Sequence, residues 1–216
     1  MDPFHARLAR LALAVAAEYG FALAGGYAVQ LHGLGDRPSK DVDLFTPDMG
    51  GPARAAELIA EAYRRDGLTV TLKQPSDTFA RLWVNDKYGN ASKVELGVDW
   101  RAHSPVRLEI GPVLHLDDAV ANKVVALFSR WAARDFLDVD AALLSGLYSR
   151  EDLMRLAADH DLGFDRRYFA DALSQLNRIP DQEFADYGLD EAAIAELRER
   201  FTEWHHELVM TREAAI

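Results

Sequence analysis

The sequence predicts an α+β protein in which a mixed α/β half, ending near residue 114, precedes a helical half. Short apolar or alternating runs, separated by turn residues, recur between residues 21 and 100 and are typical of strands. From Asp117 onward, apolar residues recur almost entirely at helical spacing. No flexible linker lies between the halves, so we expect domains at residues 1–114 and 115–216, the helical one closing a ligand cleft.

The order of elements follows from the same patterns. A helix opens the first half, because Phe4, Leu8 and Leu11 recur on one helical face. In this half we expect helices at residues 3–19, 27–32 and 53–65, and strands at 21–24, 41–45, 68–74, 79–85 and 93–100. In the second half we expect helices at 117–131, 134–145, 149–160, 165–177 and near 190–210. Asp117 is the expected N-cap of the first of these.

The composition limits the classes of function. The chain has no cysteine and no run of about 20 apolar residues, so we expect no disulfide, no thiolate metal site and no membrane span. A reducing cytoplasm is therefore the expected location. The net charge of −11 argues against a broad nonspecific nucleic-acid surface, but it allows a local basic groove and suits a site that binds divalent cations. The 4 tryptophans, Trp83, Trp100, Trp131 and Trp204, are expected in the core rather than as stacking platforms for bases.

Asp41 and Asp43 are the first candidate site residues. In a strand, residues i and i+2 face the same side with Cα atoms roughly 6.5–7 Å apart, so the two carboxylates converge on one point. Adjacent carboxylates repel each other, and a hard divalent cation such as Mg²⁺ or Mn²⁺ relieves that repulsion. The pair alone leaves a second interpretation open, in which both acids lie at a strand end and pair with solvent, Arg37 or Lys40.

Three neighbouring features favour a site that binds phosphates and metal. Gly25-Gly26 separates a strand from a helix, where backbone N–H groups favour a phosphate, although a plain tight turn is the simpler explanation of this pair alone. Ser39 lies two residues before the acid pair, with its hydroxyl within reach of a phosphate oxygen or a metal ligand shell. A third carboxylate is available from Glu95 or Asp99, which share one face of their strand. Glu95, among apolar neighbours, is the first choice.

The helical half adds a lysine and two acids. Lys123 lies on or beside the apolar stripe of helix 117–131. Periodicity alone favours a buried stem with a solvated ammonium, and the functional interpretation is an ammonium that contacts NTP phosphates. Asp135 and Asp138 are one helical turn apart and share a face. Pairing of Asp138 with Arg134 at i−4 is the purely structural interpretation.

These motifs, taken in order, resemble the nucleotidyltransferase superfamily with the DNA polymerase β-like fold. More closely, they resemble the AbiEii/AbiGii-type nucleotidyltransferase toxins of bacterial toxin–antitoxin systems. The resemblance covers roughly residues 20 to 145. Its motifs are GGYAVQLHG (25–33), RPSKDVDLF (37–45), KVELGVDW (93–100) and DDAVANKVVALFSRWAARDFLDVDAAL (117–143). Superfamily members more often carry aspartate where this chain has Glu95.

The resemblance implies an enzyme that moves a nucleoside monophosphate from an NTP to an acceptor hydroxyl. It assigns metal binding and catalysis to Asp41, Asp43 and Glu95, with Lys123 as a further catalytic residue. One of Asp135 and Asp138 faces the active site in this family, and Asp138, one turn deeper, is the first choice as a catalytic residue. It assigns contacts with the NTP to Gly25, Gly26, Arg37, Ser39, Lys123 and Asp135. It further implies a tRNA 3′ end as acceptor and an antitoxin protein as partner. Two alternatives stay open, a small-molecule nucleotidyltransferase resembling the aminoglycoside-modifying enzymes, favoured by the acidic net charge, and a binding module without catalysis.

Overall fold

The computed structural model describes residues 1–73 and 75–214 and has the α+β architecture that the sequence predicts. The chain divides into two compact units. The first contains residues 1–33 and 38–119, and the second contains residues 34–37 together with residues from 120 onward. The short segment 34–37 therefore belongs to the second unit, although its neighbours on both sides in the chain belong to the first.

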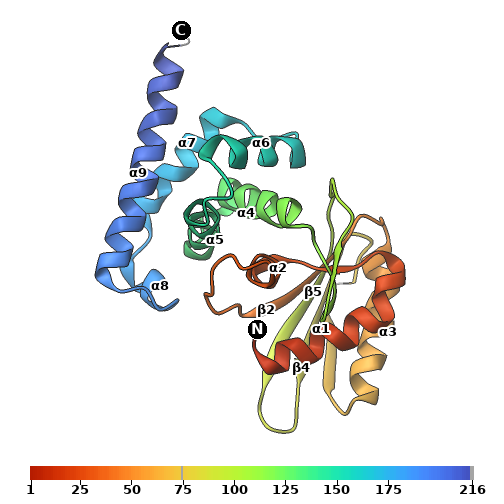
Figure 1. The fold of residues 1–216 in the computed structure, drawn as a ribbon. Coiled ribbons are helices and arrows are strands. Elements are labelled where there is room, and N and C mark those ends of the chain that lie inside the picture. The colour runs from red at the N-terminus through yellow and green to blue at the C-terminus, as the bar shows by residue number, and fades with distance from the viewer. Residues whose placement is uncertain (74, 215–216) are drawn as a thin grey trace. The chain divides into compact units, whose positions relative to one another are not determined.

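The first unit is built on a seven-stranded mixed sheet with strand order β3-β4-β5-β2-β1-β7-β6 (Figure 1). Its strands are β1 (Ala22–Leu23), β2 (Asp41–Thr46), β3 (Thr69–Lys73), β4 (Phe79–Asn85), β5 (Ala91–Val98), β6 (Val106–Leu108) and β7 (Gly111–Val113). β2 pairs in parallel with β5, and β1 pairs in parallel with β7, while the other neighbours are antiparallel. The parallel β2–β5 pair lies in the middle of the sheet and fixes the register of the candidate site.

Two helices cover one face of this sheet. α1 (Pro3–Ala16), extended by a 3₁₀ turn at Ala17–Tyr19, packs beside α3 (Gly51–Arg65) (Figure 1). α3 also packs against β3, β4 and β5. The side chains beneath these helices are fully buried and apolar, namely Val42, Leu44, Leu82, Val84, Val94 and Leu96. Because side chains alternate along a strand, the residues between them in sequence lie on the opposite face.

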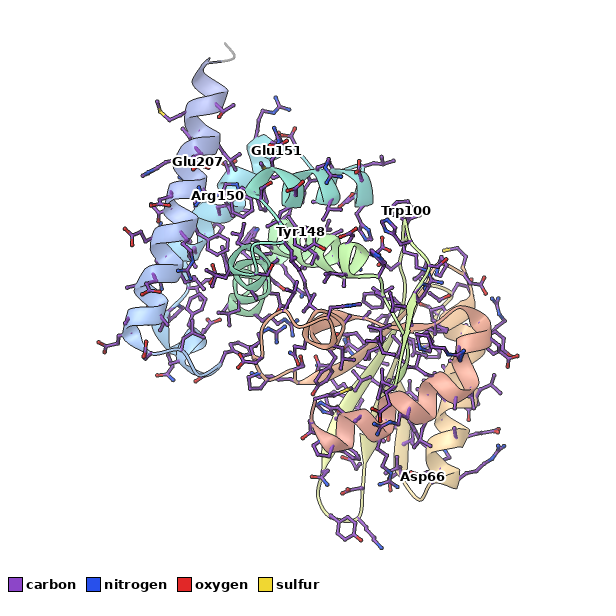
Figure 2. All side chains as sticks on the ribbon, viewed as in Figure 1. Asp66, Trp100, Tyr148, Arg150, Glu151 and Glu207 are labelled. Atoms are coloured by element: carbon purple, nitrogen blue, oxygen red, sulfur yellow. The ribbon has the colours of Figure 1, made fainter. Side chains whose placement is uncertain are left out.

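The second unit is helical. Its elements are α4 (Leu116–Arg130, which begins in the first unit), α5 (Ala133–Leu144), α6 (Arg150–His160), α7 (Arg166–Ser174), a 3₁₀ turn (Gln175–Arg178), α8 (Asp181–Ala185) and α9 (Glu191–Ala214). Edge-to-face aromatic pairs fill its core, with ring centroids 5.1 Å apart for Phe136–Phe201 and 5.2 Å for Phe169–Trp204. At the start of α6, Arg150 forms an ion pair with Glu207 of α9 (Figure 2).

Most predicted elements are confirmed, with small shifts at their ends. α2 (Gly25–Leu31) begins at Gly25, so the two glycines form its first turn instead of preceding it. α4 begins at Leu116, so Asp117 lies inside the first turn and is not the N-cap. Three elements were not predicted, β6, β7 and α8, because each spans five residues or fewer and shows no clear period. Residue 74, at the end of the third predicted strand, lies outside the described residues.

The prediction of buried tryptophans is wrong for three of the four. Trp83, Trp100 and Trp131 are 44%, 52% and 45% exposed, and Trp204 is buried at 1%. Residue type alone does not distinguish a buried tryptophan from an exposed one, because an aromatic side chain is buried only where another element covers it. Among residues 1–73 and 75–214, no helix combines the length and the apolar character that crossing a bilayer requires.

Candidate active site

Three carboxylates share one face of the first unit's sheet. Asp43 of β2 is the direct register partner of Glu95 of β5, so their Cα atoms lie on neighbouring strands about 4.8 Å apart. Asp41 lies two residues before Asp43 on the same face. The alternating burial of β2 agrees with this placement, since both aspartates are partly exposed while Val42 and Leu44 are buried. The structure thus brings together the three predicted metal ligands, whose roles remain predictions.

Two basic side chains lie among these acids. Lys93 is the register partner of Asp41, and its Nζ lies 3.1 Å from Asp41 Oδ1 and 3.9 Å from Glu95 Oε1. Arg81 of β4 is the register partner of Glu95 and donates from Nε to Glu95 Oε1 at 2.8 Å. Neither residue is predicted as part of the site from the sequence, because cross-strand neighbours depend on the strand order. The alternation of exposed residues along β4 and β5 is the signal that places them on this face.

Gly25 approaches Asp43 so closely that only glycine fits. Its φ is +62°, and a Cβ built on it lies 1.9 Å from Asp43 Oδ2. In the same region, the Ala24 N–H donates to the Asp43 carbonyl at 2.8 Å, which ties the chain before α2 to β2. Gly25, which is predicted to contact a phosphate, thus has a second role, because its missing side chain leaves room for the Asp43 carboxylate.

Ser39 is held in place by two side chains of α2, one of which contacts His5 of α1. Its hydroxyl accepts from Gln30 Nε2 at 3.1 Å, and its carbonyl accepts from the Tyr27 hydroxyl at 3.4 Å. Tyr27 OH in turn lies 2.6 Å from Nδ1 of the buried His5. Burial lowers the pKa of His5, and the nearby Asp2 and Asp41 carboxylates only partly offset that effect. The Ser39 segment therefore enters β2 in a fixed position, two residues before Asp41.

The acid cluster has the donor set that a hard divalent cation requires. Mg²⁺ prefers oxygen ligands and binds through one or two carboxylates together with phosphate oxygens. The Lys93 ammonium lies within 4.0 Å of one oxygen of Asp41 and one oxygen of Glu95, so a positive group already neighbours both carboxylates. Asp43, between them on the same face, adds a third carboxylate. The residues present therefore fit Mg²⁺ or Mn²⁺.

In the second unit, a buried ion cluster joins three predicted site residues. Asp138 of α5 accepts from Arg37 Nε and Nη2, both at 2.6 Å, and lies 3.0 Å from Lys123 Nζ of α4. The side chains of Arg37, Lys123 and Asp138 are only 10%, 8% and 4% exposed. Burial alone raises the pKa of Asp138, but the Lys123 ammonium and the Arg37 guanidinium together hold that pKa below its usual value. Asp138 therefore binds the Arg37 guanidinium and the Lys123 ammonium together. These contacts come from segments far apart in the chain, unlike the local pair with Arg134 that helical spacing suggests.

Asp135 has a different environment from Asp138. It is fully buried and pairs with Arg130 through both oxygens, at 2.9 and 2.7 Å. It also accepts from the backbone N–H of Ala132, which precedes α5. These contacts close the turn between α4 and α5, where Trp131 has a φ of 52°. The predicted contact of Asp135 with an NTP stays a prediction, and the contacts that this structure shows are those of a turn-closing residue.

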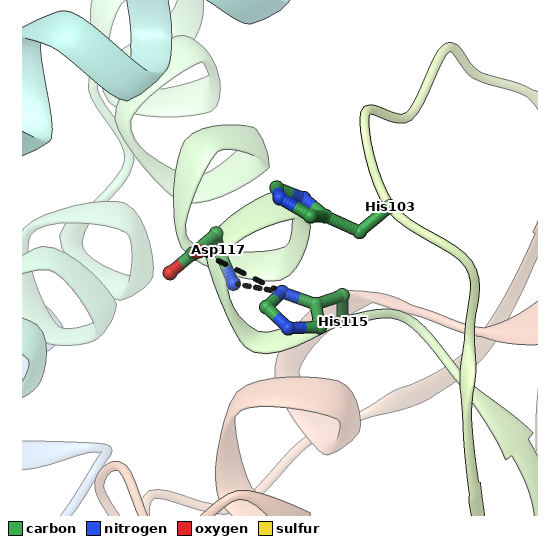
Figure 3. A group of neighbouring side chains, drawn as sticks. All are labelled: His103, His115 and Asp117. Carbon is green, nitrogen blue, oxygen red and sulfur yellow. Dashed lines mark hydrogen bonds and ion pairs between the residues drawn. The ribbon is translucent and has the colours of Figure 1, made fainter.

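A second group of metal-ligating side chain types lies where β7 leads into α4. It consists of His103, His115 and Asp117, whose ligand atoms all lie within 4.8 Å of one another (Figure 3). The two rings stack with centroids 4.4 Å apart, and His115 Nδ1 accepts the Asp117 N–H at 3.2 Å. Beside them, the buried Asp118 accepts from the backbone of Ala102 and His103. These bonds anchor the 101–104 loop to the first turn of α4. No motif in the sequence predicts this group, because His103 is far from His115 and Asp117 in the chain.

A mixed sheet with three carboxylates on one face, next to a strand-to-helix turn that opens with glycine, agrees with the nucleotidyltransferase class that the motifs resemble. The particular family follows from comparison. The chain belongs to the family described as "AbiEii: Nucleotidyl transferase AbiEii toxin, Type IV TA system", whose model matches residues 7–213. The resemblance seen in the motifs is thereby confirmed, and the protein is a nucleotidyltransferase of this toxin family. No curated protein sequence matches the chain at a significant level.

Two solved structures share the fold. One, described as a nucleotidyltransferase from H. pylori, superposes with a TM-score of 0.57 at 19% identity and covers 98% of this chain and 99% of its own. The other, the nucleotidyltransferase toxin MenT4 from Mycobacterium tuberculosis H37Rv, gives a TM-score of 0.53 at 16% identity and covers 92% of this chain and 82% of its own. At these identities the similarity shows a common fold.

Proposed function

We propose that this nucleotidyltransferase depends on Mg²⁺ and transfers a nucleoside monophosphate from an NTP to the 3′-terminal hydroxyl of a tRNA. The family gives the class of reaction and the toxin context. One observation carries the rest, the alignment of Asp41, Asp43 and Glu95 on one sheet face, with the Lys93 ammonium beside Asp41 and Glu95. In this arrangement Asp41 and Asp43 would bind a divalent cation, and Glu95 beside them would bind the acceptor hydroxyl.

In the proposed reaction, the acceptor oxygen attacks the α-phosphorus of the NTP. A bond forms between these two atoms, the bond from the α-phosphorus to the bridging oxygen breaks, and pyrophosphate leaves with the electron pair. Asp41 and Asp43 would hold Mg²⁺, which when bound neutralises charge on the phosphate oxygens. Glu95 would orient the acceptor hydroxyl and accept its proton. Most of the rate enhancement in such chemistry comes from positioning and electrostatics.

The remaining predicted residues would act on the NTP phosphates or on one another. The Ser39 hydroxyl and the backbone at Gly25 and Gly26 would contact the triphosphate. Lys123 would neutralise negative charge that develops on the leaving group, and Asp138 would hold the lysine in position, as its 3.0 Å contact with Nζ allows. Asp138 is thus a positioning residue in this proposal. Membership of a type IV toxin–antitoxin family supports a cognate antitoxin protein as partner.

A second acceptor class has one observation in its favour. The net charge of −11 attracts cationic small molecules such as aminoglycosides better than it attracts RNA. Incubation of the protein with labelled NTP, and either bulk tRNA or an aminoglycoside, separates the two acceptors. Label found only on the aminoglycoside would refute the tRNA proposal.

Growth arrest on induced expression tests the proposal in cells. We expect the wild-type chain to arrest growth and Asp41→Ala to abolish the arrest, because the variant loses a metal ligand. Asp77→Ala is the matched control, since Asp77 is an exposed carboxylate on the β3–β4 turn. It should arrest growth like the wild type. Arrest by Asp41→Ala at full strength, with equal protein levels, would refute the proposed catalytic role.

A further inference from the structure

Beyond the acids of β2 and β5, the same sheet face continues across two more strands, β4 and β3, which carry basic and aromatic side chains. β3 is the edge strand, followed by β4 and β5. The register places Lys73, Arg81 and Glu95 in one row across these strands, next to Asp43. A second row contains Thr71, Trp83 and Lys93, next to Asp41. We call Lys73, Phe79, Arg81, Trp83 and Lys93 the basic aromatic face.

Each aromatic side chain of this face has a cation beside it. The Lys93 ammonium lies 6.0 Å from the centroid of the Trp83 ring, and the Arg81 guanidinium carbon lies 5.3 Å from that of Phe79. Trp83 is 44% exposed, and Lys73 is exposed at the end of the edge strand. A large indole kept at the surface costs hydrophobic free energy, because its burial would remove apolar area from water. The face therefore has the composition of a ligand-binding surface.

The charge of the face contrasts with that of the whole chain. The sequence carries 35 acidic and 24 basic side chains, for a net charge of −11. Lys73, Arg81 and Lys93 nevertheless gather on three adjacent strands of one sheet face. Cations interleaved with exposed aromatic rings match a single-stranded nucleic acid, whose phosphates pair with the cations and whose bases stack on the rings.

We propose that the basic aromatic face binds the single-stranded end of a nucleic-acid acceptor and leads its terminal hydroxyl to Glu95. This inference rests on the proposed function, because it takes Glu95 as the carboxylate that meets the acceptor. It adds the surface that would hold the acceptor named in the proposed function. Bases stack on Trp83 and Phe79, and the phosphates contact Lys73 and Arg81.

The dimensions of the face suit this occupant. From β3 to β5 the strands span about 10 Å, because neighbouring strands are about 4.8 Å apart. Stacked nucleotides advance about 3.4 Å each along a strand, so the span holds about three nucleotides. Lys73 and Trp83 lie toward the sheet edge, and Glu95 lies beside the metal-binding aspartates. A single-stranded 3′ end therefore fits with its last nucleotide at the acid cluster.

Fluorescence anisotropy with a labelled 12-nucleotide single-stranded RNA tests the proposal directly. We expect Trp83→Ala to weaken binding about 5- to 150-fold, which corresponds to the loss of one stacked base. Lys73→Gln should lower the slope of log K against log salt by roughly 0.7, the value for one lost phosphate contact. A DNA of the same sequence in a parallel arm shows whether the 2′-hydroxyl contributes to recognition.

The β4–β5 turn offers a matched control. Tyr88 is 77% exposed, and the Lys87 ammonium lies 5.0 Å from its ring centroid, so this pair has the same chemistry away from the sheet face. Tyr88→Ala and Lys87→Gln should bind the RNA like the wild type. Equal RNA affinity for Trp83→Ala, Lys73→Gln and the two turn variants would overturn the proposal. A wild-type protein that does not bind the RNA would overturn it as well.

The labelled-NTP transfer assay separates failure of this inference from failure of the proposed function. If the inference holds, Trp83→Ala raises KM for the RNA acceptor and leaves kcat and the Kd for the Mg²⁺–NTP complex unchanged. If label reaches RNA with the same KM in Trp83→Ala and the wild type, the binding face is wrong while the proposed function stands. If the wild type binds RNA through Trp83 and Lys73 but transfers no label, the face stands and the proposed reaction fails.

Discussion

Asp43 and Glu95 are direct register partners on parallel strands, so their carboxylates lie side by side although 52 positions separate them in the chain. Glu95 also accepts from Arg81 at 2.8 Å and lies 3.9 Å from the Lys93 ammonium. A carboxylate at this position meets both the aspartates that would hold a metal and the basic side chains of the neighbouring strands. Glu95 therefore lies at the boundary between the acidic and the basic part of this sheet face.

Replacement of this carboxylate tests its role in proton transfer. Glu95→Gln keeps the shape and removes the base, and we expect kcat for nucleotide transfer to fall about 10²- to 10⁴-fold. Glu95→Asp keeps the carboxylate on a shorter side chain and should retain part of the activity. Glu109→Gln is the matched control, since the Glu109 side chain is 95% exposed, and it should have wild-type activity. Wild-type kcat for Glu95→Gln would exclude a role as base.

Substitution of Gly25 tests the close packing of α2 on Asp43. Gly25→Ala should destabilise the fold and abolish transfer, because the new Cβ would lie 1.9 Å from Asp43 Oδ2. Gly33→Ala separates this collision from backbone strain, since Gly33 has a φ of +86° and no atom within 4 Å of its Cβ position. The control should cost about 1–2 kcal/mol from the left-handed backbone alone. Urea unfolding and transfer activity of both variants measure the difference, and equal effects would contradict the predicted collision.

Lys93 competes with a metal for the same carboxylates. Its Nζ lies within 4.0 Å of both Asp41 and Glu95, so a bound divalent cation meets a like charge there. Lys93→Gln removes that charge, and we expect a lower Kd for Mg²⁺ in calorimetric titration of the protein without NTP. Lys87→Gln, on the β4–β5 turn, should leave the Kd unchanged. Weaker metal binding by Lys93→Gln would mean that the lysine supports the site.

Asp138 makes stability depend on pH in the acid range. Its pKa is lower in the folded protein than the ordinary value of 3.8, so its contribution to the free energy of unfolding is complete above 3.8. That contribution is lost as the pH falls through the lower folded pKa. Asp138→Asn should cost about 3–5 kcal/mol at pH 7, because Lys123 and Arg37 lose their buried counter-ion. The cost should shrink toward pH 3, as urea unfolding across this range would show.

The exposed carboxylate Asp159 on α6 provides the control for this experiment. Asp159→Asn should leave the free energy of unfolding within about 0.5 kcal/mol of wild type at both pH values. A cost of Asp138→Asn that stays constant between pH 7 and pH 3 would show that the ion cluster does not cause the pH dependence.

Local periodicity was sufficient for much of the candidate site. Alternation along one strand placed Asp41 and Asp43 on the same face, and the order of short elements gave the fold class. Strand alternation and apolar neighbours predict Glu95 as the third carboxylate, but its pairing with Asp43 depends on a parallel β2–β5 contact between residues far apart in the chain. Sequence patterns do not contain that register, because any strand of suitable length has the same alternation.

The contacts that were missed are those between distant segments. Arg37 and Asp138 are 101 positions apart, and the sequence around each residue does not predict the contact between them. Arg81 and Lys93 lie on predicted strands, but only the strand order brings them next to the acids. Trp83 was expected in the core, since large aromatics are usually buried, and its exposure follows from a sheet face that leaves it uncovered.

The most direct test of the account is transfer of labelled nucleotide to RNA by the purified protein. The four α-³²P-labelled NTPs are each incubated with total tRNA, with Mg²⁺ or with EDTA, using the wild type, Asp41→Asn and the surface control Asp77→Asn. The account predicts label on tRNA with the wild type and Asp77→Asn in Mg²⁺, and none with Asp41→Asn or in EDTA. Transfer by Asp41→Asn at the wild-type rate, or undiminished transfer in EDTA, would contradict it.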